Sequence, residues 1–70
     1  MLISEFIESK KLTQQQFAGM VGVSQGLIWQ WINGRQKVTA ERAIQIERAT
    51  DGAINRHDLR PDLFHAQAAA

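Results

Sequence analysis

The chain contains no cysteine, which excludes a disulfide framework and any metal site built from thiolates. No segment approaches the roughly 18 consecutive apolar residues that a membrane-spanning helix needs. The first eight residues include Glu5 and Glu8, and they lack the basic start and apolar stretch of a signal peptide. We therefore expect no membrane partner and a cytoplasmic location.

The sequence is equally poor in the groups that catalysis requires. His57 and His65 stand on either side of Pro61, and neither lies at a spacing that gathers metal ligands. The glycines at positions 19, 22 and 26 do not form a phosphate-binding loop, because no strand precedes them and no Lys-Ser/Thr pair follows. We expect no catalytic residue, no metal and no cofactor, and hence a protein that is not an enzyme.

The composition of the 70 residues is that of one small folded domain, with 44% hydrophobic and 21% charged residues. The net charge is only +1, but its distribution is uneven. Residues 9–40 hold four basic residues and no acidic one, whereas residues 1–8 carry two acidic residues and no basic one. Because Lys and Arg neutralise phosphates, this distribution favours a polyanionic partner such as DNA. Chance clustering of four charges remains the alternative.

The hydrophobic periodicity of the first 33 residues predicts three short helices. The first should end near Lys11, with Ser4 as its early cap. A second helix should run from Thr13, whose capping box is completed by Gln16, to about residue 21. Gly22 then permits a sharp turn, because glycine enters the left-handed region at little cost.

The third helix should begin at the N-cap Ser24 and end at Asn33, with Gly34 following it. At about 100° per residue its side chains divide into two faces. The apolar face consists of Leu27, Ile28, Trp31 and Ile32. The opposite face, which carries no charge, consists of Gln25, Gly26, Trp29, Gln30 and Asn33. Amides, a glycine and an aromatic ring suit contact with base edges, although a protein interface or an uncharged solvent face would also fit.

The two tryptophans of this helix should lie on opposite faces, because two residues correspond to a rotation of about 200°. We expect Trp31 to be a core residue. Trp29 should be exposed among amides and serve as a contact to DNA or to a partner subunit. The alternative is a ring folded back over Lys or Gln stems.

The C-terminal half predicts a fourth helix and a shorter fifth one. Thr39 should cap the fourth helix and Gly52 should end it, with Ile44 on its flank. Asn55 and Asp58 can cap a fifth helix or turn that stops before Pro61. We expect the apolar residues that follow to be buried, namely Leu59, Leu63 and Phe64. Residues 1–65 should form the domain and residues 66–70 a frayed tail.

The segment QQQFAGMVGVSQGLIWQWINGR, with Ala18 at the helix contact and Gly22 at the turn, resembles the helix-turn-helix of phage-type Cro and related repressors. The following segment, VTAERAIQIERATDGAINRHDLRPDLF, is similar to the YdaS-like group of Cro-like regulators. The resemblance implies an all-α, lambda-repressor-like bundle of about five helices that binds double-stranded operator DNA, often as a dimer. It also implies a bacterial or phage-infected cell.

The resemblance further implies the roles of individual residues. The third helix would lie in the major groove and contact bases through Gln25, Gly26, Trp29 and Gln30. Phosphate contacts would come from Gln14, Ser24, Asn33, Arg35 and Lys37. Candidate dimer contacts are Ile44, Leu63 and Phe64. This sequence departs from the repressor pattern at Gly26, where a side chain is frequent, and at Trp29, where a polar residue is frequent.

Two functions follow from the resemblance. The first is a Cro-type transcriptional repressor that acts by occupying an operator. The second is an antitoxin-like protein that neutralises a toxin-like protein partner and regulates its own operon.

Overall fold

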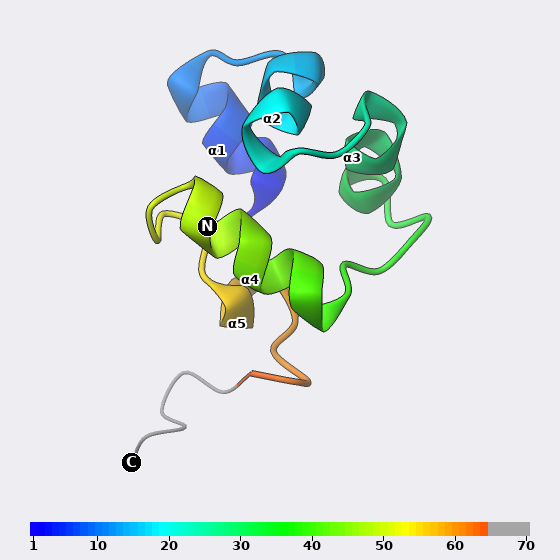
Figure 1. Cartoon of the computed structure of the whole chain (residues 1–70), viewed down its shortest axis with the longest axis vertical. Coiled ribbons are helices and arrows are strands. Elements are labelled where there is room, and N and C mark those ends of the chain that lie inside the picture. The colour runs from blue at the N-terminus through cyan, green and yellow to red at the C-terminus, as the bar shows by residue number, and fades with distance from the viewer. Residues whose placement is uncertain (65–70) are drawn as a thin grey trace.

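The computed structural model describes residues 1–64, and in this part of the chain it contains five α-helices and no strand (Figure 1). The helices are α1 (Ile3–Lys10), α2 (Gln14–Val21), α3 (Gln25–Ile32), α4 (Ala40–Ala49) and α5 (Arg56–Leu59). The predicted all-α bundle of about five helices is therefore confirmed. None of the helices in these 64 residues has the length and apolar character required to cross a membrane.

The helix-turn-helix consists of α2, a three-residue turn and α3, and local hydrogen bonds fix its geometry. Thr13 Oγ1 accepts from the Gln16 N–H at 3.0 Å, and Gln16 Oε1 accepts from the Thr13 N–H at 2.8 Å. Gly22 ends α2 with φ 90°, which a side chain would disfavour. Ser24 Oγ then accepts from the Leu27 N–H at 3.2 Å and starts α3. These caps confirm the predicted boundaries of both helices.

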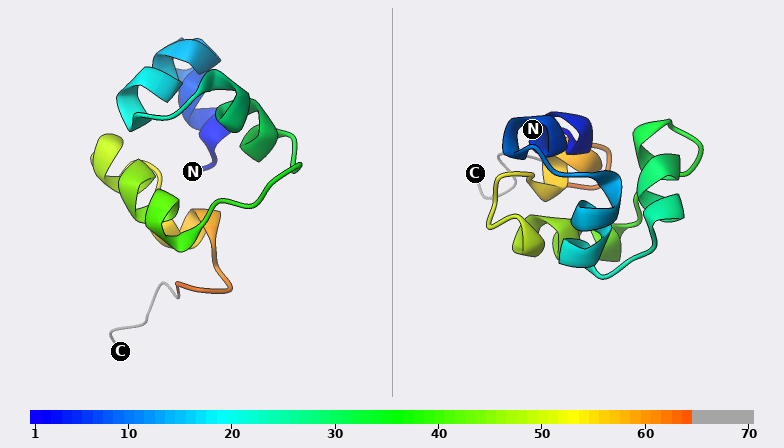
Figure 2. Two further views of the ribbon diagram at one scale, coloured as in Figure 1. Left: turned by 45° about the vertical axis from the view of Figure 1, so that its right-hand side comes forward. Right: turned by 90° about the horizontal axis from the view of Figure 1, so that it is seen from above.

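The core lies where α2, α3 and α4 meet, and α1 closes it on the side of α2 (Figure 2). Its most completely buried large side chains are Phe17, Ile28, Ile46 and Ile54. The ring of Phe6 on α1 packs against Phe17 with centroids 5.7 Å apart. Burial of these side chains is the main source of stability in a domain of this size.

The turn between α4 and α5 is organised by a buried threonine. The Thr50 hydroxyl donates to the Ile46 carbonyl at 2.9 Å and accepts from the Ile54 N–H at 3.1 Å. This pair of bonds lets Ile54 enter the core although no helix contains it. Helix α4 ends at Ala49 with Thr50 as its C-cap, so Gly52, with φ 88°, lies in the following turn and does not itself end the helix as expected.

Two expectations about the ends of the described chain were wrong. Ser4 lies inside α1 and does not cap it; the N-cap is Leu2, whose N–H donates to Glu5 Oε1 at 2.8 Å. The Glu5 carboxylate thus accepts from the N–H of the N-cap residue, whereas a capping serine hydroxyl would accept from an N–H in the first turn of the helix. Leu63 is 47% exposed, because the turn that follows Pro61 directs it away from the core. Leu59 and Phe64 do pack against the core.

The expectation of a frayed tail over residues 66–70 lies outside the described residues, as does His65.

Candidate nucleic-acid interface

Helix α3 presents two chemically different faces, as its sequence predicts. Ile28 is fully buried and Trp31 is 9% exposed, and both belong to the core. All five residues of the opposite face are exposed, namely Gln25, Gly26, Trp29, Gln30 and Asn33. The helix lies at the edge of the molecule in Figures 1 and 2, so this face is open to a partner. The four predicted base contacts are therefore accessible together on one surface.

The turn after α3 brings a cation back to the exposed tryptophan. Gly34 adopts φ 70°, and the Arg35 N–H donates to the Gln30 carbonyl at 2.8 Å. The Arg35 guanidinium carbon consequently lies 5.9 Å from the centroid of the Trp29 ring, within range of a cation–π interaction. The Arg35 guanidinium thus lies against an indole that remains 46% exposed.

The predicted phosphate contacts occupy the ends of helices and the loop after α3. Ser24 caps α3 through its oxygen, which leaves its hydroxyl proton available for donation. Asn33 Nδ2 donates to the Trp29 carbonyl at 2.9 Å, so one of its two amide protons is used to close the helix. Gln14 is the first residue of α2 and is partly exposed.

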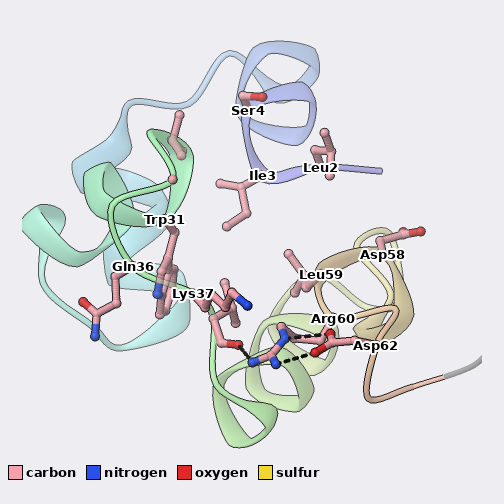
Figure 3. A pocket seen from close by; sticks show the side chains of 13 residues that line it. Leu2, Ile3, Ser4, Trp31, Gln36, Lys37, Asp58, Leu59, Arg60 and Asp62 are labelled. Atoms are coloured by element: carbon pink, nitrogen blue, oxygen red, sulfur yellow. Dashed lines mark hydrogen bonds and ion pairs between the residues drawn. The ribbon is translucent and has the colours of Figure 1, made fainter.

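Arg35 and Lys37 are the two cations of the loop, and both are exposed. Among residues 1–64, neither forms a salt bridge with a carboxylate. Lys37 also lines a groove of about 360 Å³ between the start of α1, the end of α3 and α5 (Figure 3). Both positive charges are therefore available to an external anion.

Arg60 binds the end of the loop after α3, a role that the sequence analysis did not predict. Its Nη1 donates to the Val38 carbonyl at 2.8 Å. Figure 3 labels Arg60 and Asp62 and marks the hydrogen bonds of Arg60 with dashed lines. The same guanidinium forms a fork with Asp62, with Nε to Oδ1 at 3.0 Å and Nη2 to Oδ2 at 2.7 Å. The fork lowers the pKa of Asp62 to about 2 and raises the pKa of Arg60. The Arg60 and Asp62 side chains of the LRPDLF stretch thus have a structural role in supporting this loop.

Gln45 plays a similar supporting role beneath the turn between α2 and α3. Its Nε2 donates to the carbonyl of Val21, the last residue of α2. Arg42 Nη1 holds the Gln45 amide by donating to its Oε1 at 2.9 Å. The bond satisfies a helix-end carbonyl and ties α4 to the turn. The sequence contains no local signal for this contact, because the partners are 24 residues apart.

The three candidate dimer contacts lie in two places. Ile44 is partly exposed on α4, beside a shallow hollow lined by Glu41, Gln45 and Arg48. Neither Leu63 nor Phe64 lines that hollow. Phe64 is instead partly covered by the Arg56 guanidinium, whose carbon lies 5.6 Å from the ring centroid.

The described residues offer little for metal binding. No group of three or more His, Cys, Asp or Glu side chains gathers within residues 1–64. His57 lies 3.6 Å from Asp58 through Nε2 and Oδ1, a contact between two partly exposed neighbours on α5.

Comparisons with known proteins identify the family. The family model described as "Bacterial toxin YdaS" matches residues 4–68. Two relatives come from Escherichia coli strain K12. One, named "Putative transcriptional regulator YdaS", is 44% identical over 50 residues, which are 71% of this chain and 51% of the relative. The other, named "Prophage transcriptional regulatory protein", is 39% identical over 54 residues, 77% of this chain and 82% of the relative.

The chain thus spans about half the length of the first relative. No solved structure matches the chain. Because the family model covers nearly the whole sequence, the chain belongs to the YdaS family.

Proposed function

We propose that this YdaS-family protein is a sequence-specific DNA-binding repressor of the Cro type, which occupies an operator and so excludes RNA polymerase. One observation carries the proposal: an uncharged, exposed face of α3 lies beside a loop whose two cations form no salt bridge among residues 1–64. A merely solvated helix face usually carries charged side chains. The names of the two relatives, both transcriptional regulators, support the same class of function.

The proposed complex divides specificity from affinity. Helix α3 enters the major groove, and Gln25, Gly26, Trp29 and Gln30 contact base edges. Phosphates are contacted by Gln14, Ser24, Asn33, Arg35 and Lys37. Base contacts then select the sequence, while phosphate contacts supply most of the sequence-independent affinity and fix the register. No cofactor takes part.

A two-fold dimer would place two copies of α3 about 34 Å apart on a near-palindromic site. Ile44, Leu63 and Phe64 remain the proposed contacts between copies, because they are apolar and partly exposed in the single chain. Sedimentation of the Ile44→Asp and Leu63→Asp variants, with and without operator DNA, tests each position separately. Unchanged association of both variants would remove these residues from the interface.

Selection of bound sequences from random duplex DNA, at two salt concentrations, tests the proposed function directly. We expect a near-palindromic motif to be enriched at both concentrations. Binding should fall steeply with salt. Each neutralised phosphate makes the slope of log K against log salt more negative by about 0.9. A pool without any enriched motif, retained equally at both concentrations, would refute sequence-specific DNA binding.

The family description favours a second candidate, in which the protein belongs to a toxin–antitoxin pair. In this case an exposed surface binds a partner protein, and DNA binding serves autoregulation. Expression of the chain alone, and together with each adjacent reading frame, distinguishes the two candidates. Growth arrest that is caused by one of the two expressed proteins and relieved by the other favours the second candidate. Normal growth in every combination favours a repressor that has no toxin or antitoxin partner.

A further inference from the structure

The residue types on the exposed face of α3 limit which base pairs this face can recognise. Guanine is best recognised by Arg or Lys, which donate to O6 and N7, and cytosine by Asp or Glu, which accept from N4. None of these four residue types lies on the face. Its two glutamines, Gln25 and Gln30, match the donor and acceptor pair of adenine. The chemistry of the face therefore corresponds to A·T pairs.

The Trp29 indole is the large apolar group of this face, and it is 46% exposed. In the major groove, the apolar feature of the base edges is the 5-methyl group of thymine. Transfer of such a methyl group from water onto an aromatic surface is favourable. An exposed ring between Gln25 and Gln30 along the helix is thus placed to meet the thymine of a pair whose adenine binds an amide.

The surface beside Trp29 is open on the N-terminal side. Gly26 precedes Trp29 by three residues, so the two positions are neighbours on the helix surface. A Cβ atom at Gly26 would meet a single neighbouring atom within 4 Å, Ser24 Oγ at 3.9 Å. The fold therefore does not require glycine at this position. Its absence of a side chain instead leaves room for a base edge to approach the indole.

Arg35 restrains the ring from the other side. Its backbone is fixed by the bond from its N–H to the Gln30 carbonyl, and its guanidinium lies 5.9 Å from the ring centroid. A planar guanidinium stacks on an aromatic face, whereas the compact ammonium of lysine does so less well. Arg35 can thus orient the indole while its charge remains available to phosphate.

We infer that Trp29 reads the 5-methyl group of a thymine in an A·T-containing half-site, and that Arg35 is the positioning residue that holds the indole for this contact. The inference rests on the proposed binding of α3 in the major groove. It adds the class of base pair that is recognised and a role for Arg35 beyond its charge.

Uracil replacement within the operator enriched by selection from random DNA tests the inference. Uracil pairs like thymine but lacks the 5-methyl group. Replacing the critical thymine in one half-site should weaken binding of the unmodified protein about fourfold, which corresponds to the burial of one methyl group. The Trp29→Ala variant should bind the thymine and uracil operators equally. Met20→Ala, which removes another exposed apolar side chain outside α3, should retain the fourfold preference.

The Arg35→Lys variant separates positioning from charge. Because the charge is kept, its salt dependence should equal that of the unmodified protein, while its thymine-to-uracil preference should fall from about fourfold to below twofold. An unchanged thymine-to-uracil preference in Arg35→Lys would show that Arg35 does not position the indole.

The outcome also distinguishes this inference from the proposed function. An enriched operator in which no uracil replacement affects binding would overturn the reading by Trp29 and leave the repressor proposal standing. A thymine preference that persists in Trp29→Ala would likewise overturn the reading by Trp29 and leave the repressor proposal standing. Selection without any enriched motif would overturn both.

Discussion

Trp29 and Trp31 are two residues apart on one helix, yet their surroundings are opposite: Trp31 is 9% exposed and belongs to the core, whereas Trp29 is 46% exposed. The difference shows how an eight-residue helix can serve two purposes. One face of α3 holds the domain together, and the other remains open to a partner. Stability and recognition should therefore be separable by substitutions at neighbouring positions.

The largest expected effect is the loss of stability in Trp31→Ala. Truncation of a buried tryptophan costs about 3–5 kcal/mol, which is close to the whole stability that a core of this size supplies. The variant should be largely unfolded at 25 °C. Trp29→Ala should change the free energy of unfolding by less than about 0.5 kcal/mol, because its side chain is exposed. Urea unfolding followed by circular dichroism measures both, and similar losses in the two variants would contradict the division of α3 into two faces.

The next effect concerns recognition. Gln30→Ala should reduce the discrimination between the operator and a mismatched sequence by about 1–3 kcal/mol, since a bidentate base contact is lost. Fluorescence anisotropy with both duplexes at one salt concentration gives this difference. Gln15→Ala, an exposed glutamine on α2, is the matched control and should keep the discrimination. Full selectivity of Gln30→Ala would show that the exposed face of α3 is not the reading surface.

A smaller and different effect is expected in the loop after α3. Lys37→Ala should weaken binding to every sequence by a similar factor, because it removes a phosphate contact and leaves the base contacts intact. The slope of log K against log salt should decrease in magnitude by about 0.9. Lys10→Ala, at the end of α1, should leave the slope unchanged. A loss of sequence preference in Lys37→Ala would mean that affinity and specificity are not divided between loop and helix.

The parts that were predictable from the sequence are those fixed by neighbours along the chain. Thr13, Gly22 and Ser24 act on residues at most four positions away, and the periodicity of α3 correctly separates Trp29 from Trp31. The features that sequence reasoning missed depend on distant partners. Arg60 binds a carbonyl 22 residues away, and no local rule indicates that contact.

The roles of individual residues toward DNA remain predictions. The exposed positions on α3 are compatible with them, as are the loop cations, which form no salt bridge within the described part of the chain. The error at Ser4 has a simple origin: α1 begins at Ile3, ahead of the serine, and Glu5 accepts from the N–H of the actual N-cap, Leu2.

The smallest expected effect concerns the ion pair of Arg60 with Asp62, which supports the loop after α3. The fork with Arg60 lowers the pKa of Asp62 from 3.8 to about 2, so ionised Asp62 stabilises the folded chain. This contribution is complete above the pKa of the unfolded chain, and it is lost as the pH falls through about 2. Asp62→Asn should be slightly less stable than the unmodified protein near neutral pH, and the difference should shrink as the pH falls from about 4 to about 2.

Urea unfolding of both proteins near neutral pH, at about pH 4 and at about pH 2 measures this convergence. Asp51→Asn, which removes an acidic charge outside the fork of Arg60 with Asp62, is the matched control for the loss of one negative charge. The effect should be small because Asp62 is exposed to solvent, where ion pairs contribute little. A difference that stayed constant down to about pH 2 would show that Asp62 does not stabilise the loop through its charge. The bond from Arg60 Nη1 to the Val38 carbonyl would then support the loop after α3 without help from the charge of Asp62.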